Sequence, residues 1–502
     1  MPEHIRAFIV VVALGSMVWL LARPAMVQIV SPETFARWRG LWYVATVAWF
    51  LAPNFWIYVG VITVMLVIVG QRESNVFGLY LLLLIAAPPI ATPIPGFGLI
   101  NYLFMLDHYR LLALALLLPF AWRLSRRPLT IRLFQSPVDW MVLAYLALST
   151  VLAFRGGNFT SDARTALMLW IDLFLPYYVA SRSIQNLDGF RHALVGLALG
   201  GALLSVLAAF EVLRSWKLYE AASVALGLDS FGAYKMRGGL VRPGVSIIDS
   251  IALGYVIVVA AGGFLYLQGL IAGRMKCWLG WLALVIGVLA SLSRGPWVGA
   301  LLLVFVFMLT SPRPLKRLIQ GACISAFVLL ILSALPAGQK FINLLPFLGQ
   351  EEQGNVNYRA NLLTLSIPVI ERNLLFGTSD YMNAPELQVL RQGEGIIDIV
   401  NSYVGVALHA GLVGLLLFAG MFVWALLLLR RGMSWARRAS DADGLLLGRA
   451  LFASVVSIMF IILTVSSDFI VPTIYFAVVG MSCAYFLLQQ LNDRAKQAST
   501  RV

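Results

Sequence analysis

Long apolar segments recur along almost the whole chain and are separated by short polar connections. A helix needs about 20 mainly apolar residues to cross a hydrocarbon core of roughly 30 Å. The run at 40–70 is interrupted at Pro53 and Asn54, so it is either one kinked span or a tight helical hairpin. The pattern predicts about 14 membrane-spanning helices, plus or minus one, near 7–22, 40–70, 76–91, 102–121, 138–154, 165–181, 192–212, 246–268, 277–292, 296–310, 318–336, 399–429, 449–468 and 471–490.

Composition supports an all-α, polytopic integral membrane protein. Of 502 residues, 60% are hydrophobic and 12% are charged, which is about half the charged share of a soluble domain. A soluble fold of this length would need more polar side chains to cover its surface. The chain therefore places most of its mass in the bilayer.

The net charge of +14 is concentrated in short loops beside apolar runs, at 123–132, 313–317 and 430–438. Short basic loops of this kind are typical of the cytoplasmic face, so the charge does not indicate nucleic acid. Alternation then places the long, net acidic segment 337–398 and the loop 213–245 on the outer side of the membrane, and the C-terminus in the cytoplasm.

These boundaries divide the chain into five expected parts. Helices in 1–191 are followed by central helices in 192–336, which include the outer loop 213–245. The large periplasmic loop 337–398 precedes the C-terminal helices in 399–490 and a cytoplasmic tail in 491–502. Loops of this length in a membrane bundle are often functional.

The motifs of several enzyme classes are missing. The sequence contains no P-loop, no glycine-rich dinucleotide fingerprint and no metal-ligand spacing among its four histidines. Cys277, Cys323 and Cys483 are scattered at or within apolar runs, so neither a metal site nor a disulfide is expected. We expect no cofactor and no metal.

Four arginines are predicted to lie at the outer face: Arg237, Arg242, Arg294 and Arg359. A guanidinium is always charged and its planar fork matches phosphate oxygens. Convergence of Arg242 and Arg294 would suit a lipid-linked diphosphate. The alternative for each arginine is a position at the membrane interface or an ion pair with an acid such as Glu371 or Asp398.

Three motifs resemble the O-antigen ligase and O-antigen polymerase superfamily of bacterial envelope glycosyltransferases. They are Arg242-Pro-Gly-Val-Ser-Ile-Ile-Asp249 before an apolar run, Ser293-Arg294-Gly295 at a helix start, and Asn401-Ser-Tyr403 followed by Gly411-Leu-Val-Gly414. Tyr358-Arg359 and Asn373-Leu-Leu-Phe-Gly377 resemble the large outer loop of that family. The resemblance covers about 240–420 and implies a GT-C-like architecture.

One position departs from the family pattern. The ligase histidine would fall at position 400, where this chain has Val400. His409 lies too far along a helix to replace it and is expected to be a core histidine. Asp249, Glu394 and Asp398 could accept a proton instead, and the sequence does not rank them.

The resemblance implies a metal-independent glycosyltransferase of the bacterial inner membrane, in which the large loop 337–398 is periplasmic. It would move glycan from an undecaprenyl-diphosphate carrier to an acceptor hydroxyl in the periplasm. Arg242 and Arg294 would bind the diphosphate and Asn401 would orient a substrate, which makes these three the predicted catalytic residues. Arg237, Arg359, Asp249 and Tyr403 are the predicted substrate-binding residues. Expected partners are membrane lipids and proteins of polysaccharide chain-length control or export.

Val400 favours polymerisation of exopolysaccharide or O-antigen repeats over ligation to a lipid A-core-like acceptor. A transporter or flippase for lipid-linked glycan is the alternative from another class. A further polar cluster, Asp107, His108 and Arg110, marks either a functional site within a span or the water boundary of that span.

Overall fold

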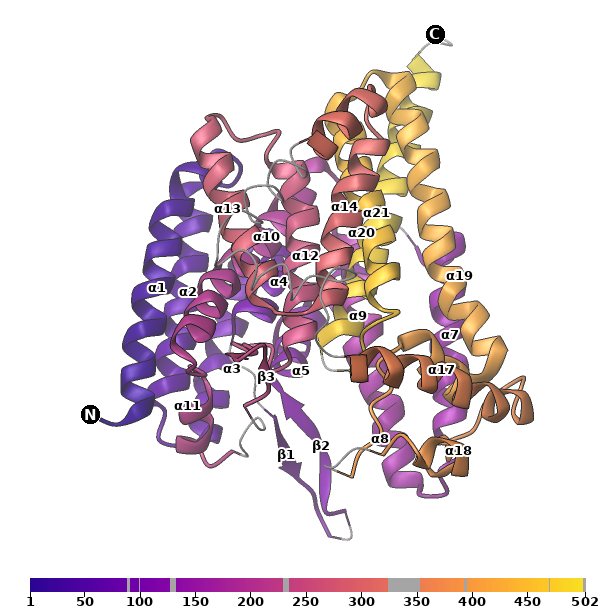
Figure 1. Cartoon of the computed structure of the whole chain (residues 1–502). Coiled ribbons are helices and arrows are strands. Elements are labelled where there is room, and N and C mark those ends of the chain that lie inside the picture. Colours follow the sequence, from indigo (N-terminus) through magenta and orange to yellow (C-terminus); the bar gives the residue numbers. More distant parts are fainter. Residues whose placement is uncertain are drawn as a thin grey trace.

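The computed structural model describes residues 1–87, 91–98, 100–126, 132–228, 234–323, 353–391, 395–468 and 470–499, and most of them are helical (Figure 1). The helices of the N-terminal half are α1 (Glu3–Met26), α2 (Pro32–Leu51), α3 (Phe55–Arg72), α4 (Val76–Ala86), α5 (His108–Leu112), η1 (Ala113–Leu117), α6 (Leu118–Ser125), α7 (Pro137–Ala153), α8 (Phe159–Leu169), η2 (Trp170–Phe174), α9 (Leu175–Ser183), α10 (Leu187–Arg214) and α11 (Glu220–Ala225). Those of the C-terminal half are α12 (Ser250–Leu267), α13 (Arg274–Ala290), α14 (Arg294–Leu309), α17 (Gln353–Arg372), η3 (Tyr381–Asn383), α18 (Pro385–Gln388), α19 (Ser402–Ala439), α20 (Ala442–Ile461) and α21 (Ile470–Ser499).

Seven helices in the described ranges are long and apolar enough to cross a membrane: α1, α3, α10, α12, α19, α20 and α21. Three shorter apolar helices, α4, α7 and α14, accompany them. The chain is therefore a helical membrane protein, as predicted. The count of about 14 spans and the GT-C-like arrangement stay predictions.

The run at 40–70 is a hairpin of two helices and not one kinked span. Helix α2 ends at Leu51 and α3 begins at Phe55. Ala52 is extended because it precedes Pro53. The side-chain oxygen of Asn54 then accepts the Ile57 N–H at 2.9 Å and caps α3.

Two predicted runs contain π-helical turns that end just before a proline. Segment η1 precedes Pro119 in the run 102–121, and η2 precedes Pro176 in the run 165–181. A proline has no N–H for the regular i to i−4 bond, and a wider turn accommodates its ring. The helix continues through each of these wider turns, over 108–125 and over 159–183.

The mostly helical chain is consistent with the all-α prediction, and two short sheets accompany the helices. Strand β1 (Ala91–Pro95) pairs antiparallel with β2 (Tyr102–Asp107), so the run predicted at 102–121 starts as a strand. A second pair, β3 (Met236–Arg237) and β4 (Leu240–Val241), lies within the predicted outer loop 213–245. The predicted span 449–468 also ends early, at Ile461.

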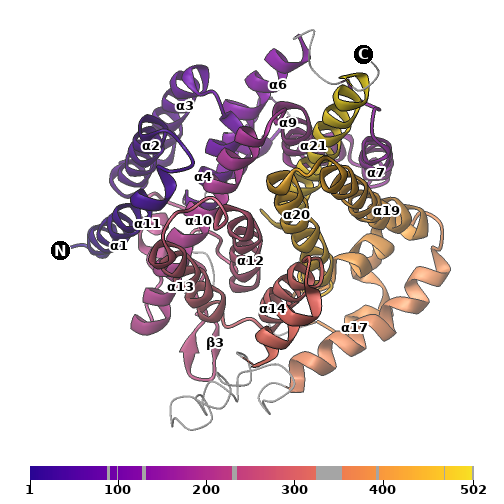
Figure 2. The same ribbon diagram turned by 90° about the horizontal axis from the view of Figure 1, so that it is seen from above.

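Helices α10, α12 and α21 form the centre of the bundle, seen from above in Figure 2. The apolar windows of α12 and α21 are each 94% buried, whereas that of α1 is 28% buried. Helices α1, α2 and α3 stand together at one side of the bundle, and α7 and α19 stand at the other (Figures 1 and 2). The peripheral helices therefore expose apolar side chains to the surroundings, as expected in lipid.

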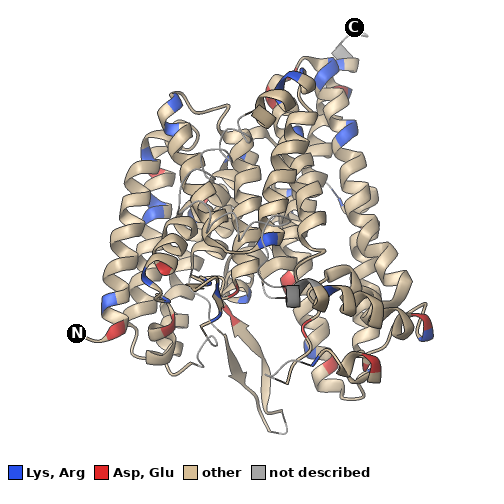
Figure 3. Cartoon of the chain, in the orientation of Figure 1, with Lys and Arg blue, Asp and Glu red and all other residues tan. Residues whose placement is uncertain are grey.

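The two ends of the bundle differ in structure. The β1–β2 hairpin, α11, α17 and α18 lie at one end, which we call the loop end, and the chain leaves α21 at the opposite end (Figure 1). The basic segments around 274–276, 313–317 and 430–438 lie at that opposite end, which we call the basic end (Figure 3). The assignment of the loop end to the periplasm stays a prediction.

The described part of the predicted outer segment 337–398 has a small core of its own. Buried side chains of α17, α18, the connection between α18 and α19, and the first turns of α19 form it: Leu362, Val369, Leu387, Leu390, Ile397, Ile399, Val400, Val404 and Leu408. Residues 337–352 and 392–394 lie outside the described residues, so Glu394 cannot be placed. The outer segment is therefore packed onto the start of α19.

Candidate functional site

Three of the predicted arginines meet at the turn between α13 and α14. Arg237, in β3, donates a hydrogen bond from Nη1 to the carbonyl oxygen of Leu292 at 2.6 Å. Arg242, directly after β4, donates from Nη2 to Ser293 Oγ at 3.2 Å. Arg294 is the next residue and the first of α14. Arg242 therefore contacts the residue that precedes Arg294, and convergence of the two guanidinium groups stays a prediction.

The start of α14 is suited to binding an anion. A positive side chain at a helix N-terminus opposes the helix dipole, so helix stability does not explain Arg294. The N-cap residue Ser293 makes no capping bond and donates its hydroxyl to Ser291 O at 2.9 Å instead. The first N–H groups of a helix lack intrahelical partners and attract phosphate. Arg294 itself is half-buried, and its positive charge adds to the attraction of this helix start for an anion.

Backbone strain is concentrated beside these arginines. Six non-glycine residues in the described ranges have positive φ, and three of them, Val245 (48°), Ile248 (70°) and Leu292 (49°), belong to the two segments that carry Arg242 and Arg294. Valine and isoleucine rarely adopt this conformation because of their branched Cβ. Such strain persists where the surroundings enforce it and is common at functional sites.

Glu211, in α10, holds the loop that follows Arg242. Its carboxylate is buried and accepts three backbone hydrogen bonds, from Leu218 N at 2.8 Å and from Gly244 N and Val245 N at 3.1 Å each. These bonds satisfy both oxygens and fix the strained loop to a core helix. Glu211 therefore positions Arg242 without facing the site itself.

The connection 462–468 between α20 and α21 joins the arginines to the outer segment. The carbonyl oxygen of Thr464 accepts a hydrogen bond from Arg359 Nη2, in α17, at 3.3 Å. Thr464 Oγ1 also lies so close to Gly295 that a Cβ there would overlap it. The glycine of Ser293-Arg294-Gly295 is thus required for α14 to pack on this connection.

Asn401 and Tyr403 hold the start of α19. The side-chain oxygen of Asn401 accepts the N–H groups of Tyr403 at 3.0 Å and Val404 at 3.2 Å, so it is the N-cap of α19. The Tyr403 hydroxyl donates to the carbonyl oxygen of Met459, in α20, at 3.1 Å. Both side chains have structural partners, and their predicted roles toward a substrate stay predictions.

Three carboxylates lie near this connection. Asp249 caps α12 by accepting the N–H groups of Ile251 and Ala252 at 2.9 and 2.8 Å, and Asp398 accepts the Ser466 hydroxyl at 3.0 Å. Burial raises the pKa of Asp468, and the charges of Asp398 and Asp249 raise it further. A carboxyl with a raised pKa is suited to accepting a proton.

A break in α19 is formed by the glycines of the third motif. Gly411 has φ 66° and ψ −167°, a region that is almost restricted to glycine. A Cβ on Gly411 would overlap the carbonyl oxygen of Leu375, and one on Gly377 would overlap that of Leu408. Across the break, Thr378 N donates to Leu408 O at 2.9 Å and Leu412 N to Leu374 O at 2.8 Å. The segment 373–378 is thereby inserted into the helix.

Arg155, at the end of α7, ties this junction together. Its Nη1 donates to the carbonyl oxygens of Phe376 and Gly377, each at 2.9 Å, and its Nη2 donates to that of His409 at 2.6 Å. The planar guanidinium can reach three acceptors at once, which an ammonium on a flexible stem does less well. Arg155 therefore positions the outer segment relative to α19.

Position 400 is a packing position in this chain. Val400 is 9% exposed and belongs to the apolar core of the outer segment. A histidine there would need a polar partner in an apolar setting. His409 is half-buried and packs edge-on against Tyr381 with 6.4 Å between ring centroids.

Asp107, His108 and Arg110 are buried within the protein. Arg110 donates to both carboxylate oxygens of Asp172, in η2, at 2.8–3.1 Å and pairs with Asp107 at 2.8 Å. His108 Nε2 lies 3.0 Å from the carbonyl oxygen of Leu84. Each charge has a partner within the bundle, which accounts for the cluster structurally.

The region from the middle of α13 to α19 matches a known family. Residues 279–419 fit the protein family described as O-antigen ligase. The predicted resemblance is confirmed. The family segment includes Ser293-Arg294-Gly295, the described part of the outer segment and the Asn401 to Gly414 motif, whereas Arg237, Arg242 and Asp249 precede it. The family implies a glycosyl-transferring enzyme of polysaccharide biosynthesis. No curated protein matches the chain.

The family segment and its neighbours bring the predicted residues to one end of the bundle. Hydrogen bonds link Arg237 and Arg242 to the turn before Arg294, and Arg359 to Thr464. The charge of Asp249 helps to raise the pKa of Asp468. Sequence reasoning missed Glu211, Arg155 and Asp468. Glu211 had a signal, since it is an acid within the apolar run 192–212. Arg155 had none, because its role depends on three backbone carbonyls far away in sequence.

Proposed function

We propose that the chain is an inner-membrane glycosyltransferase that moves glycan from an undecaprenyl-diphosphate carrier to an acceptor sugar hydroxyl at the periplasmic face. The hydrogen bond that places Arg242 beside Ser293, the residue before Arg294 at the start of α14, is the observation that carries this proposal. Two guanidinium groups beside a helix N-terminus form a site for a diphosphate.

In the proposed reaction, the bond between the anomeric carbon and the diphosphate oxygen breaks as the acceptor oxygen bonds to that carbon. The diphosphate departs with the bonding electron pair. Arg242 and Arg294 stabilise the negative charge that develops on the departing oxygen. The donor already carries a good leaving group, so the proposed step uses neither a nucleotide nor a metal.

The acceptor hydroxyl must lose its proton in this step. Asp468 is the proposed acceptor, since its raised pKa retains a transferred proton better than an ordinary aspartate does. Asp249 is less suited because its side chain caps α12. Asp398 is less suited because it accepts the Ser466 hydroxyl.

Within this proposal, polymerisation of repeat units is favoured over ligation. The ligase pattern has a histidine where Val400 is packed in an apolar core. Arg359, from α17, would approach the acceptor side of the site, because the outer segment is bound to both α19 and the connection 462–468. The outer segment would thus form the wall along which the acceptor glycan enters.

Replacement of Arg242 and Arg294 by alanine in the native host tests the proposal. Membrane expression is confirmed first, and the surface glycan is then resolved on a gel. Loss of the polymer ladder with single repeat units remaining supports polymerisation, and full-length polymer left on the carrier lipid indicates ligation. Donor retained in the cytoplasmic leaflet indicates transport instead.

Arg372 is the matched control, because this arginine of the outer segment pairs with Glu386 at the surface and is half exposed. Arg372→Ala should leave the ladder unchanged. An unchanged ladder in the double variant Arg242→Ala, Arg294→Ala would overturn the proposed mechanism.

A further inference from the structure

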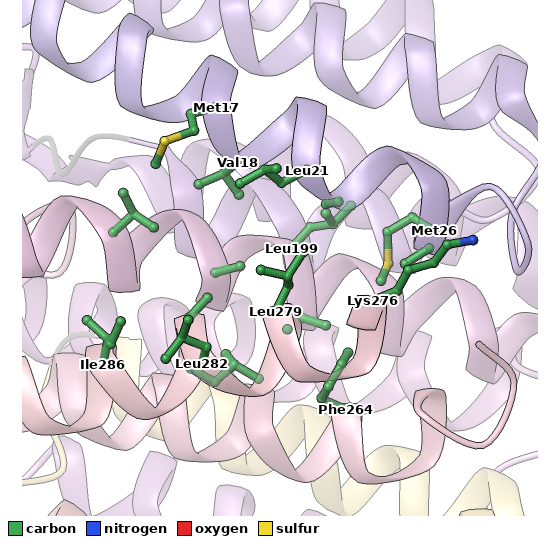
Figure 4. Close-up of a pocket in the computed structure, with 18 residues that line it drawn as sticks. Met17, Val18, Leu21, Met26, Leu199, Phe264, Lys276, Leu279, Leu282 and Ile286 are labelled. Atoms are coloured by element: carbon green, nitrogen blue, oxygen red, sulfur yellow. The ribbon is translucent and has the colours of Figure 1, made fainter. Parts of the chain in front are cut away.

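An apolar groove runs between α1 and α13 and has α10 as its floor (Figure 4). It encloses about 200 Å³. Met17 and Leu21 of α1, Leu199 of α10, and Leu282 and Ile286 of α13 line it. An apolar cavity of this size does not hold ordered water, so its natural occupant is hydrocarbon.

The groove exists because small residues line the helices that surround it. Ala22 lies on α1, Ala202 on α10, and Gly280 and Ala283 on α13. Helix α1 also packs loosely, with only 28% of its apolar window buried. A groove open to the bilayer on this side is accessible to a lipid chain without unfolding any element.

One charged residue stands at an end of the groove. Lys276 is the only lining residue with a charged or polar side chain, and Figure 4 shows its amine beside Met26, away from Met17 and Ile286. Within the described part of the chain, its ammonium has no hydrogen bond or ion pair. A cation beside an apolar channel fits an amphiphile with a negative head.

The surroundings of Lys276 are basic as well. Arg274 begins the same helix and Arg23 lies in the last turn of α1. The two helix ends are joined, since Ala272 N donates to Gln28 Oε1 at 2.7 Å. This end of the groove therefore lies at the basic end of the bundle, opposite the arginine site.

The length of the groove fits one leaflet. Lys276 and Ile286 are ten residues apart on α13, which is roughly 15 Å along the helix axis. That is about half of a hydrocarbon core of roughly 30 Å. We propose that this groove binds one acyl chain of an anionic glycerophospholipid whose phosphate pairs with Lys276. The site is independent of the proposed glycosyl transfer.

Native mass spectrometry of the full chain tests this proposal. The protein in detergent is mixed with equal amounts of phosphatidylglycerol and phosphatidylethanolamine that carry identical acyl chains. The wild type should retain one phosphatidylglycerol molecule about five times more often than one phosphatidylethanolamine molecule. This ratio is the effect of one lysine at a lipid surface. Lys276→Gln should remove most of the preference, and Ala283→Phe should displace the retained lipid by filling the groove.

Two controls have the same chemistry outside the groove. Lys316→Gln removes another lysine of the basic end, and Val285→Phe adds a ring to α13 at a position that does not line the groove. Both should behave as the wild type. An unchanged preference in Lys276→Gln would contradict the proposal.

A photoactivatable group placed midway along the acyl chain of phosphatidylglycerol gives a second test that needs no variant. Cross-links should map to peptides from Glu3–Met26 and Arg274–Ala290. Cross-links confined to other helices would overturn the assignment of the groove. The result for Ala283→Phe is used only if this variant and Val285→Phe each elute as a monodisperse peak.

Discussion

Arg242 and Ser293 lie 51 residues apart in the sequence and are joined by a hydrogen bond of 3.2 Å from Nη2 to Oγ. The bond connects the strained loop after β4 to the residue that precedes Arg294. It therefore holds Arg242 close to the start of α14, where the proposed diphosphate would bind.

Ser293→Ala should impair the proposed transfer by displacing Arg242 rather than by removing a charge. A bond of this type to a charged group contributes about 1.5–3 kcal/mol, so we expect roughly a tenfold or larger rise in KM for the lipid-linked donor, with a smaller change in kcat. Ser293→Thr keeps the hydroxyl and should restore most of the affinity. Equal kinetics for Ser293→Ala and the wild type would show that the bond has no such role.

The pH profile of transfer should report Asp468. A base acts in its ionised form, so activity should fall as the pH is lowered through the raised pKa of Asp468. Asp398→Asn removes a negative neighbour, lowers that pKa and should move the acidic limb to lower pH. Glu386→Gln, at the surface, is the control and should leave the limb in place. Loss of the acidic limb in Asp468→Asn, with about 100-fold lower kcat, is expected.

Gly411→Ala should destabilise the protein by roughly 1–3 kcal/mol or more, because alanine adopts this backbone conformation at high cost and its Cβ would overlap Leu375 O. Gly405→Ala is the matched control in the same helix, where a Cβ would lie at an ordinary 3.5 Å from Ile399 Cγ2. The midpoints of thermal unfolding in detergent micelles compare the stabilities of the two variants. Equal midpoints would refute the proposed need for glycine at 411.

Arg155→Lys should loosen the junction between the outer segment and α19. Lysine keeps the charge but loses the fork that reaches three carbonyls. Amide exchange at Thr378 and Leu412 should accelerate by about tenfold or more, as expected for local opening. Arg164→Lys removes a similar fork, which holds the carbonyls of Tyr102 and Leu103, and should leave Thr378 and Leu412 protected.

The membrane bundle could be predicted from the sequence because a long apolar segment has one stable conformation in lipid. That conformation is a helix, whose backbone N–H and C=O groups are hydrogen-bonded to one another. The sequence-based prediction of helices was wrong where contacts with distant residues determine the local structure. Residues 102–107 are apolar enough for a helix, yet they pair with β1. The end of α20 at Ile461 was missed for a similar reason, since the carbonyls of Ile462, Thr464 and Val465 bind Ser402 and Arg359.

The arginines of the site could be predicted individually because each stands near an apolar run. Their supporting residues could not. Glu211 binds a loop through backbone N–H groups, and Arg155 binds three carbonyls, so neither contact has a side-chain partner that a sequence pattern would reveal. Asn401, which was matched to a family motif, is the N-cap of α19, and its predicted role toward a substrate stays a prediction.

Reconstitution of the purified chain with an undecaprenyl-diphosphate-linked repeat unit tests the central claim most directly. The measurement follows the release of undecaprenyl diphosphate together with the formation of a glycosidic bond. The account predicts coupled release and bond formation by the wild type and by Arg372→Ala, and a loss of at least about 100-fold in Arg242→Ala and Arg294→Ala. Undiminished bond formation in those two variants, or movement of the donor across the bilayer without a new bond, would contradict it.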